Sequence, residues 1–204
     1  AGLSKALMTL LETEEVSRFT QQLLKETDTG VDNIRVVEVE TPISRRKFKE
    51  LVLYHQGHPM SVEEESDGTV RLIHLGPELH MLFDDNTESP VLFVDELDRS
   101  LHTLLTQHVV KRVLTADSRK PRQLIFTTHD TNLLDLALLP RDSVWFVEKD
   151  KTGNSTLYSL AEFKSTQLNQ LTNELEKGYL QGRFGAIPFP ADPRHLGWLT
   201  GAEQ

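Results

Sequence analysis

The chain has 204 residues and a formal net charge of −9, with 38% hydrophobic and 26% charged residues, which is the composition of one or two globular domains. It contains no cysteine, which excludes disulfides and cysteine-based zinc sites, and no run of about 18 apolar residues, which excludes a transmembrane helix. Residues 1–100 carry a net charge of −10 and residues 101–204 one of +1. An acidic chain repels phosphate backbones, so we expect no general nucleic-acid binding by this chain alone.

The N-terminal part of the sequence predicts a helix followed by a small antiparallel sheet. Leucines recur at helical spacing over residues 3–26, and Gly30 ends that helix. Partial alternation and β-branched residues predict strands over residues 32–40 and 48–55. We therefore expect residues 1–60 to form an N-terminal segment of one helix and a β-hairpin.

From residue 66 onward, predicted strands alternate with predicted helices. In chain order we expect a helix over 66–83 kinked at Pro77, a strand over 91–95, a helix over 101–114, a strand over 123–127, a short helix over 131–138, and strands over 143–148 and 155–159. We expect the strands at 91–95 and 123–127 to be buried, the former on both faces. The inner face of the helix over 101–114 should hold Leu101, Leu104, Leu105, Val109, Val113 and Leu114.

Such alternation is typical of a largely parallel sheet covered by helices on both faces. The predicted fold class is therefore α/β, a largely parallel sheet flanked by helices and preceded by the N-terminal helix and small antiparallel segment. We expect residues 61–190 to form this lobe and residues 191–204 to form a tail that is extended or loosely packed, beginning near Ala186. No signal peptide is recognisable at the N-terminus, so we expect a cytoplasmic protein.

Function in parallel sheets gathers at the carboxyl ends of the strands, where this sequence places its most suggestive residues. Asp95 and Glu96 directly follow the apolar stretch VLFV. One carboxylate there can hold a magnesium shell while the next orients or deprotonates a water, as in nucleoside triphosphatases. Acidic residues also mark the ordinary exit of a buried strand from a core, so the pair alone leaves both interpretations open.

Two further segments point to phosphate chemistry. His129 follows the next predicted buried strand, where an imidazole can hydrogen-bond a terminal phosphate, although a plain polar residue is the alternative. Ser66 and Gly68 begin a predicted helix, and the exposed N–H groups of a helix N-terminus suit a phosphate. A routine capped helix would have the same sequence.

In this order and spacing, the three segments resemble the C-terminal half of an ABC-type ATPase head of the SMC/RecF group. Within that group the chain is most similar to the AAA-family ATPases of bacterial anti-phage and abortive-infection loci (RloA- and AbiL-like). The strings DELDRSLH and TTHDTNLLD carry the resemblance most specifically. The strings ESDGTVRL, WFVEKD and EKGYLQGRFGAIPF support it, and together they cover most of residues 30–190.

The resemblance implies a role for each matching residue, with ATP and Mg²⁺ as cofactors. Asp95 would hold Mg²⁺ through water, Glu96 would be the catalytic base, His129 would contact the γ-phosphate, and Asp98 would reach across a dimer interface. Ser66, Gly68 and Thr69 would contact the γ-phosphate of the nucleotide held by the opposite subunit. Asp67 departs from the Gly usual in transporter signatures and puts a carboxylate near that phosphate site.

The resemblance also implies partners. We expect a homodimer or higher oligomer of heads, a separate effector such as a nuclease or toxin that the nucleotide-driven switch gates in anti-phage defence, and no membrane partner. Nucleic acid is expected only for the intact assembly.

The sequence lacks one expected motif, because G-x-x-x-x-G-K-[ST] occurs nowhere in it. Without that loop there is no nest of N–H groups for the phosphates and no lysine between them, so we expect a fragment that alone binds ATP poorly and hydrolyses it negligibly. One alternative is a nonenzymatic dimerisation or interaction module that has lost its nucleotide. A less favoured alternative is a metal-dependent nuclease built on the acidic cluster Asp84, Asp85, Asp95, Glu96 and Asp98.

Overall fold

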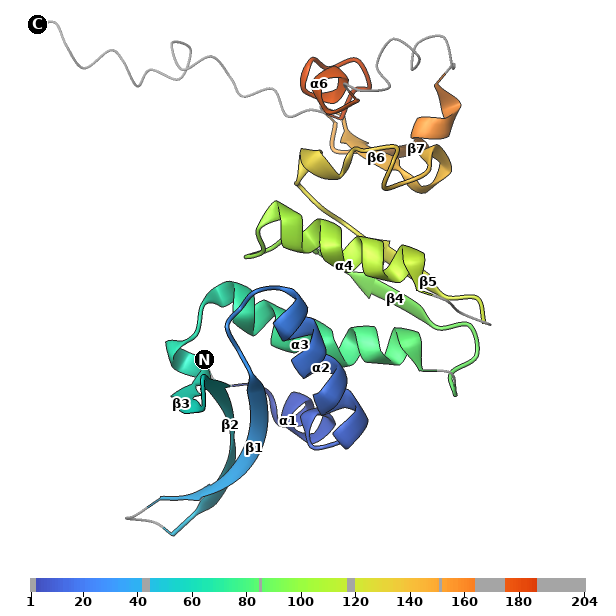
Figure 1. The fold of residues 1–204 in the computed structure, drawn as a ribbon. Coiled ribbons are helices and arrows are strands. Elements are labelled where there is room, and N and C mark those ends of the chain that lie inside the picture. The colour runs from blue at the N-terminus through green and yellow to red at the C-terminus, as the bar shows by residue number, and fades with distance from the viewer. Residues whose placement is uncertain are drawn as a thin grey trace, which may run out of the picture. The chain divides into compact units, whose positions relative to one another are not determined.

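The computed structural model describes residues 3–41, 45–84, 86–116, 120–150, 152–163 and 175–186. They belong to two compact units, residues 1–130 and residues 131–204. The first unit contains an antiparallel sheet, a parallel strand pair and most of the helices, and the second contains an antiparallel hairpin and a short helix (Figure 1).

The N-terminal helix is divided in two. Helix α1 spans Lys5–Leu11 and helix α2 spans Glu14–Glu26, so the prediction of one helix over residues 3–26 is wrong. The break occurs because Thr13 adopts an extended backbone (φ −71°, ψ 124°) as the N-cap of α2. Threonine favours that conformation and is a common N-cap residue, so the leucine pattern continues across a change of helix direction.

A three-stranded antiparallel sheet follows the helices; it contains the two predicted strands and a third that was not predicted. Strands β1 (Asn33–Glu40), β2 (Lys47–His55) and β3 (His58–Ser61) lie in that order, and β1 pairs with β2 along its whole length. A tight turn through Gln56 and Gly57, both with positive φ, connects β2 to β3. A single 3₁₀ turn, η1 (Val62–Glu64), then leads into the next helix.

Helix α3 (Asp67–Phe83) packs against α2, and the two helices supply much of the first unit's core (Figure 1). The two helices approach so closely that a Cβ atom on Gly76 would overlap the side chain of Thr20, which is why glycine occupies that position. Pro77 lies inside α3 and cannot donate a backbone hydrogen bond there. The fully buried leucine and isoleucine side chains of these two helices are Leu23, Leu24, Leu72, Ile73, Leu75 and Leu79.

Strands β4 (Val91–Val94) and β5 (Gln123–Phe126) pair in parallel, in the register Val91 to Gln123. The expectation that these strands are buried is wrong for one face: Val91 is 62% exposed, Phe93 is 63% exposed, and Ile125 is also exposed. These residues share a face because alternate side chains point the same way and paired residues lie opposite each other. None of the described elements covers that face. The apolar sequence pattern therefore predicted more burial than a two-stranded sheet provides.

Helix α4 (Thr103–Thr115) connects the two parallel strands. Its buried residues are Thr106, Val109 and Val110, whereas Leu104 and Leu114 are exposed, so the predicted inner face is partly wrong. The helix is rotated so that Arg112 can reach α2, where its guanidinium pairs with Glu26 and lies 4.9 Å from the ring centre of Phe19.

The second unit is a hairpin that supports an aromatic cluster. Strands β6 (Trp145–Lys149) and β7 (Ser155–Ser159) pair antiparallel and form a sheet of their own. Within the described part of this unit, single turns and a short helix accompany them: η2 (Thr131–Leu133), η3 (Arg141–Ser143), η4 (Leu160–Glu162) and α6 (Leu175–Leu180). The predicted helix over 131–138 is wrong, because only the single turn η2 forms and the chain continues as non-helical turns.

The buried cluster of this unit combines aliphatic side chains with stacked aromatic rings. Phe146 stacks on Phe184 and Tyr179 with ring centres 5.8 and 5.7 Å apart. The hydroxyls of Tyr158 and Tyr179 donate to backbone carbonyls near the end of the described chain, and burial raises the pKa of the Tyr158 hydroxyl. Most of the predicted tail, from residue 187, lies outside the described residues. The mixed α/β fold class, with a parallel strand pair and flanking helices, is confirmed.

Candidate functional site

The candidate site lies where the parallel strands β4 and β5 end. The ladder between them continues one step past the strands: the amide of Thr127 donates to the carbonyl of Val94 at 3.1 Å, and the amide of Leu97 donates to the carbonyl of Thr127 at 3.0 Å. This pairing places Asp95 and Glu96 directly beside the segment that leads to His129. The shared edge forms because carboxyl ends of parallel strands coincide.

One hydroxyl connects the two adjacent carboxylate residues to β5. The Thr127 Oγ1 accepts a hydrogen bond from the amide of Glu96 at 2.8 Å and donates to the Oδ1 of Asp95 at 2.5 Å. A carboxylate in this position can only accept, so the hydroxyl proton is directed at Asp95 and a lone pair remains for the amide.

Glu96 has an unusual backbone that a distant side chain stabilises. Its φ is +49°, a left-handed conformation that costs a residue with a Cβ about 1–3 kcal/mol. The Nη2 of Arg71, from α3, donates to the carbonyls of Asp95 at 3.2 Å and Glu96 at 3.0 Å, one on each side of the Glu96 Cα. The Nε of the same guanidinium is buried and has no hydrogen-bond partner among the described residues. Arg71 and Thr127 therefore fix the backbone from which the Glu96 carboxylate extends.

The loop that follows the carboxylates is a series of tight turns around one buried side chain. Leu97 is fully buried, whereas Glu96 and Asp98 on either side of it are partly exposed. The amide of His129 donates to the Oδ1 of Asp98 at 3.4 Å, so the second strand end is tied to this loop as well. Ser100 closes the loop with a positive φ of 60°.

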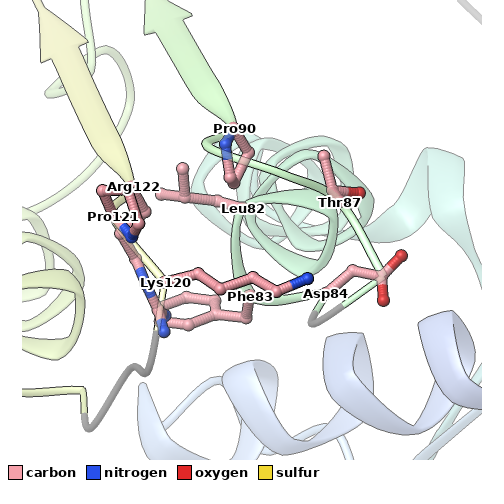
Figure 2. Close-up of a pocket in the computed structure, with 8 residues that line it drawn as sticks. All are labelled: Leu82, Phe83, Asp84, Thr87, Pro90, Lys120, Pro121 and Arg122. Carbon is pink, nitrogen blue, oxygen red and sulfur yellow. The ribbon is translucent and has the colours of Figure 1, made fainter.

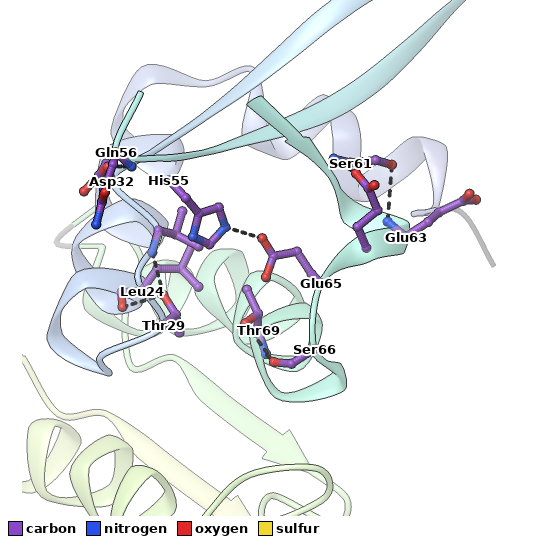
Figure 3. A network of polar contacts seen from close by, with 12 residues as sticks. Leu24, Thr29, Asp32, His55, Gln56, Ser61, Glu63, Glu65, Ser66 and Thr69 are labelled. Carbon is purple, nitrogen blue, oxygen red and sulfur yellow. Dashed lines mark hydrogen bonds and ion pairs between the residues drawn. The ribbon is translucent and has the colours of Figure 1, made fainter. Parts of the chain in front are cut away.

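The N-terminus of α3 touches the same loop. Ser66 is the N-cap, and its Oγ accepts from the amide of Thr69 at 3.1 Å and lies 2.9 Å from the Thr69 hydroxyl (Figure 3). A Cβ atom on Gly68 would lie 2.9 Å from the carbonyl oxygen of Ser100, so only glycine allows this approach. The helix start is thereby packed against the loop that carries Glu96.

A partly buried histidine–carboxylate contact fixes the chain just before that helix. Glu65, whose side chain is only 5% exposed, contacts the Nε2 of His55 on β2 (Figure 3). The carboxylate directly precedes Ser66, so the antiparallel sheet sets where α3 begins. A pairing of this kind usually serves to orient the chain rather than to add much stability.

All the site residues predicted from the sequence lie in the first unit and form two neighbouring groups. Asp95, Glu96, Asp98 and His129 are gathered at the ends of β4 and β5, and Ser66, Gly68 and Thr69 lie at the start of α3, which Arg71 and Ser100 link to the first group. Sequence spacing gives no role to Arg71 or Thr127, although both lie inside the strings that carry the resemblance. Their hydrogen bonds to Asp95 and Glu96 become apparent only in the folded structure.

The donor set is compatible with a magnesium ion that is held mainly by phosphates. Within the described residues, no group of three or more His, Asp or Glu side chains could hold a metal ion alone. Mg²⁺ commonly uses one or two carboxylates, several waters and the phosphates of its nucleotide. Asp95, at the end of β4, fits the single carboxylate of such a set. Of the acidic cluster considered for a nuclease, Asp85 lies outside the described residues.

The opposite end of the same strands carries a small pocket without this chemistry. Pro90 and Arg122 immediately precede β4 and β5, and the Arg122 guanidinium lies 4.7 Å from the ring centre of Phe83 (Figure 2). Nearby, the backbone amide of Asn86 lowers the pKa of the Asp84 carboxyl.

Comparison with known families identifies the class of protein. Residues 9–135 match the family described as "AAA domain, putative AbiEii toxin, Type IV TA system", which covers more than half of the chain. The matched region contains every candidate site residue named above. The chain therefore belongs to this AAA-domain family, whose general chemistry is nucleotide binding and hydrolysis.

Solved structures define the fold more narrowly. The chain is similar, at 18% identity and a TM-score of 0.53 over 82% of its length and 98% of the other chain, to a structure from work on ATP-driven dimerisation and DNA-stimulated activation of SMC ATPases. It is also similar to the Smc head domain with a coiled coil and joint from Pyrococcus yayanosii, at 15% identity and a TM-score of 0.51 over 79% of this chain. A third structure, an Smc head bound to the C-terminal winged-helix domain of ScpA, gives 16% identity and a TM-score of 0.50 over 81% of this chain.

These similarities establish the fold of an SMC-type ATPase head. The chain spans 29% of the Pyrococcus yayanosii structure and 56% of the ScpA-bound one. No curated protein matches the sequence. Among the described residues, no helix is long and apolar enough to cross a membrane.

Proposed function

We propose that this chain is the part of an ATPase head that supplies the water-activating carboxylate, and that it works as a nucleotide-driven switch. The observation that carries the proposal is the tethered Asp95–Glu96 pair beside His129 at the end of a parallel strand pair. Hydrogen bonds from Thr127 and Arg71 hold this pair in place, as a preorganised catalytic group requires.

Each residue has a proposed role in hydrolysis of the terminal phosphate. Glu96 accepts the proton of the attacking water, and His129 hydrogen-bonds the γ-phosphate. Asp95 holds the magnesium shell through water. Bound Mg²⁺ would supply neutralisation of the charge that develops between the β- and γ-phosphates.

The nucleotide contacts at the start of α3 are proposed to act between two heads. Ser66, Gly68 and Thr69 present a hydroxyl and helix N-terminal amides, which suit the γ-phosphate of a nucleotide held by the opposite subunit. Asp98 lies in the loop between this helix start and Glu96, where a residue can reach across a two-fold interface. The proposal therefore includes a head-to-tail pair of heads with two nucleotides between them.

The chain needs a second polypeptide segment for this function, because its sequence contains no G-x-x-x-x-G-K-[ST] loop. The exposed apolar face of β4 and β5, formed by Val91, Phe93 and Ile125, is where we propose that the segment carrying that loop packs. Such packing would bury this face and bring phosphate-binding amides to the carboxyl ends of the strands.

The wider role we propose is the gating of a separate effector, a nuclease or toxin, in anti-phage defence. The support is the family to which the chain belongs, whose description names a putative toxin and a Type IV TA system, together with the resemblance of the strings DELDRSLH and TTHDTNLLD to those of abortive-infection ATPases. The chain's own acidic charge favours a protein effector over direct contact with nucleic acid.

The proposal is tested by changing Glu96→Gln in the chain assayed together with a polypeptide that supplies the missing loop. Loss of the base should lower the rate constant of ATP hydrolysis about 10²- to 10⁴-fold, while ATP affinity stays within about threefold. Steady-state phosphate release and equilibrium nucleotide binding measure the two quantities. Glu88→Gln, which makes the same charge change at an exposed loop residue, is the matched control.

An unchanged rate in Glu96→Gln would show that Glu96 is not the base. The alternative of a nonenzymatic interaction module predicts that no added segment produces hydrolysis or tight nucleotide binding. Calorimetric titration of the completed assembly with Mg-ATP separates the two functions.

A further inference from the structure

Thr127 makes hydrogen bonds to four consecutive residues of the facing strand end. Its amide donates to Val94, its hydroxyl donates to Asp95 and accepts from the amide of Glu96, and its carbonyl accepts from the amide of Leu97. The distances are 3.1, 2.5, 2.8 and 3.0 Å in that order. Among the described residues, the Thr127 Oγ1 is the one atom that hydrogen-bonds both the Asp95 carboxylate and the Glu96 amide.

The two backbone hydrogen bonds of Thr127 and the two hydrogen bonds of its hydroxyl differ in which side chains allow them. The backbone bonds extend the parallel ladder, and any residue at this position could make them. The hydroxyl bonds require a group that donates and accepts at once, which restricts the position to serine or threonine. The side chain of Thr127 therefore does something that strand pairing alone does not require.

We infer that the Thr127 hydroxyl is a positioning group that fixes the Asp95 carboxylate and the Glu96 backbone relative to each other. This inference rests on the proposed function, in which these two residues act on the same nucleotide. Thr127 does not touch the reacting atoms itself; it orients the groups that do, in the way that outer partners orient metal-binding carboxylates.

The position of Thr127 in the chain also connects the segment after β5 to the loop after β4. It lies two residues before His129, whose amide is tied to Asp98. The segment 127–129 is therefore joined to the loop 95–98 at both of its ends. Thr127 therefore lies in the short segment that connects His129 to the loop carrying Glu96.

The first arm of the test needs only this chain and no ATP hydrolysis. Thr127→Val keeps the shape and removes the hydroxyl, Thr127→Ser keeps the hydroxyl, and Thr128→Val removes a similar bond, since the Thr128 hydroxyl accepts from the amide of Asp130 at 3.0 Å. Amide hydrogen exchange at Glu96, measured by NMR, should accelerate about tenfold or more in Thr127→Val because its amide loses its acceptor. It should stay within about threefold of the parent in the other two variants.

The second arm measures turnover in the assembly completed by the missing loop. We expect Thr127→Val to lower kcat about 10- to 100-fold and to raise the Mg²⁺ concentration needed for half-maximal rate, with little change in the KM for ATP. Thr127→Ser should restore most of the rate, and Thr128→Val should match the parent. Far-UV circular dichroism of each variant confirms that the fold is retained.

The outcomes separate the two claims. An active parent in which Thr127→Val changes neither exchange nor turnover would overturn the inference, as would equal losses in Thr127→Val and Thr127→Ser. A completed assembly whose turnover does not depend on Glu96 would overturn the proposed function instead, and the exchange result would still decide whether the hydroxyl positions the Glu96 backbone.

Discussion

The loop over residues 95–100 and the aromatic cluster of the second unit are held in place by different forces. The loop has one buried side chain, Leu97, and depends on hydrogen bonds from Thr127 and Arg71. The cluster packs Val144, Leu160 and Leu175 together with rings that stack on Phe146, and tyrosine hydroxyls at its edge donate hydrogen bonds to backbone carbonyls. Polar tethers fix direction, whereas stacked rings contribute burial, so a change in the loop should affect activity more than stability and a change in the cluster should do the reverse.

The largest effect on stability is expected from Phe146→Ala. Truncation removes a buried ring that packs on three others, which costs about 3–5 kcal/mol in large-to-small core substitutions. Urea unfolding of the full chain measures the loss of stability, and limited proteolysis measures how readily residues 131–186 are cleaved. Trp145→Ala, on the exposed face of the same strand, should cost less than about 0.5 kcal/mol. Similar costs for the two variants would contradict the cluster's role.

A smaller effect on stability is expected from Arg71→Met. The variant loses the bonds to the carbonyls of Asp95 and Glu96, but it also removes a guanidinium whose Nε is buried without a partner, so we expect a net cost of about 1–2 kcal/mol. The rate of the completed ATPase should fall about tenfold or more because the Glu96 backbone loosens. Denaturant-induced unfolding measures the change in stability, and phosphate release measures the rate of ATP hydrolysis. A variant that loses stability without losing rate would make Arg71 a purely structural residue.

The smallest effect is expected at the turn between β6 and β7. Hydrogen bonds from Thr152 and Asn154 lower the pKa of the Asp150 carboxyl to about 2. Because the folded-state pKa lies below the unfolded value, the stabilisation is present above about pH 4 and is lost as the pH falls towards 2. Asp150→Ala should therefore lower Tm slightly at pH 6, and the difference from the parent should shrink as the pH falls through about 2.

The sequence predicted the positions of the carboxylates better than their surroundings. An apolar stretch followed by Asp95 and Glu96 must end a strand with its acids at the edge, and that information is local. The exposure of Val91 and Phe93 is not local, because it depends on how many strands lie beside β4. The division of the first helix at Thr13 could not be predicted either, because the leucine spacing continues through it.

The tethers of the site could not be predicted from spacing. Arg71 lies 24 and 25 residues from the carbonyls it binds, and Thr127 lies 31 residues from Glu96. Contacts at such separations depend on how α3 and β5 pack against β4. The family resemblance named the residues that would meet substrate, but it did not identify the residues that hold them.

The buried Leu97 between Glu96 and Asp98 has a consequence for length variation in this loop. Its side chain is fully buried, and both acidic neighbours emerge from the surface on either side of it. Inserting or deleting one residue between positions 95 and 98 would either pull an acid into the interior or lift the leucine out of it, at a cost of several kcal/mol for an unpaired buried charge. The loop can therefore exchange exposed residues such as Arg99, but its length is constrained by a leucine that takes no part in the chemistry.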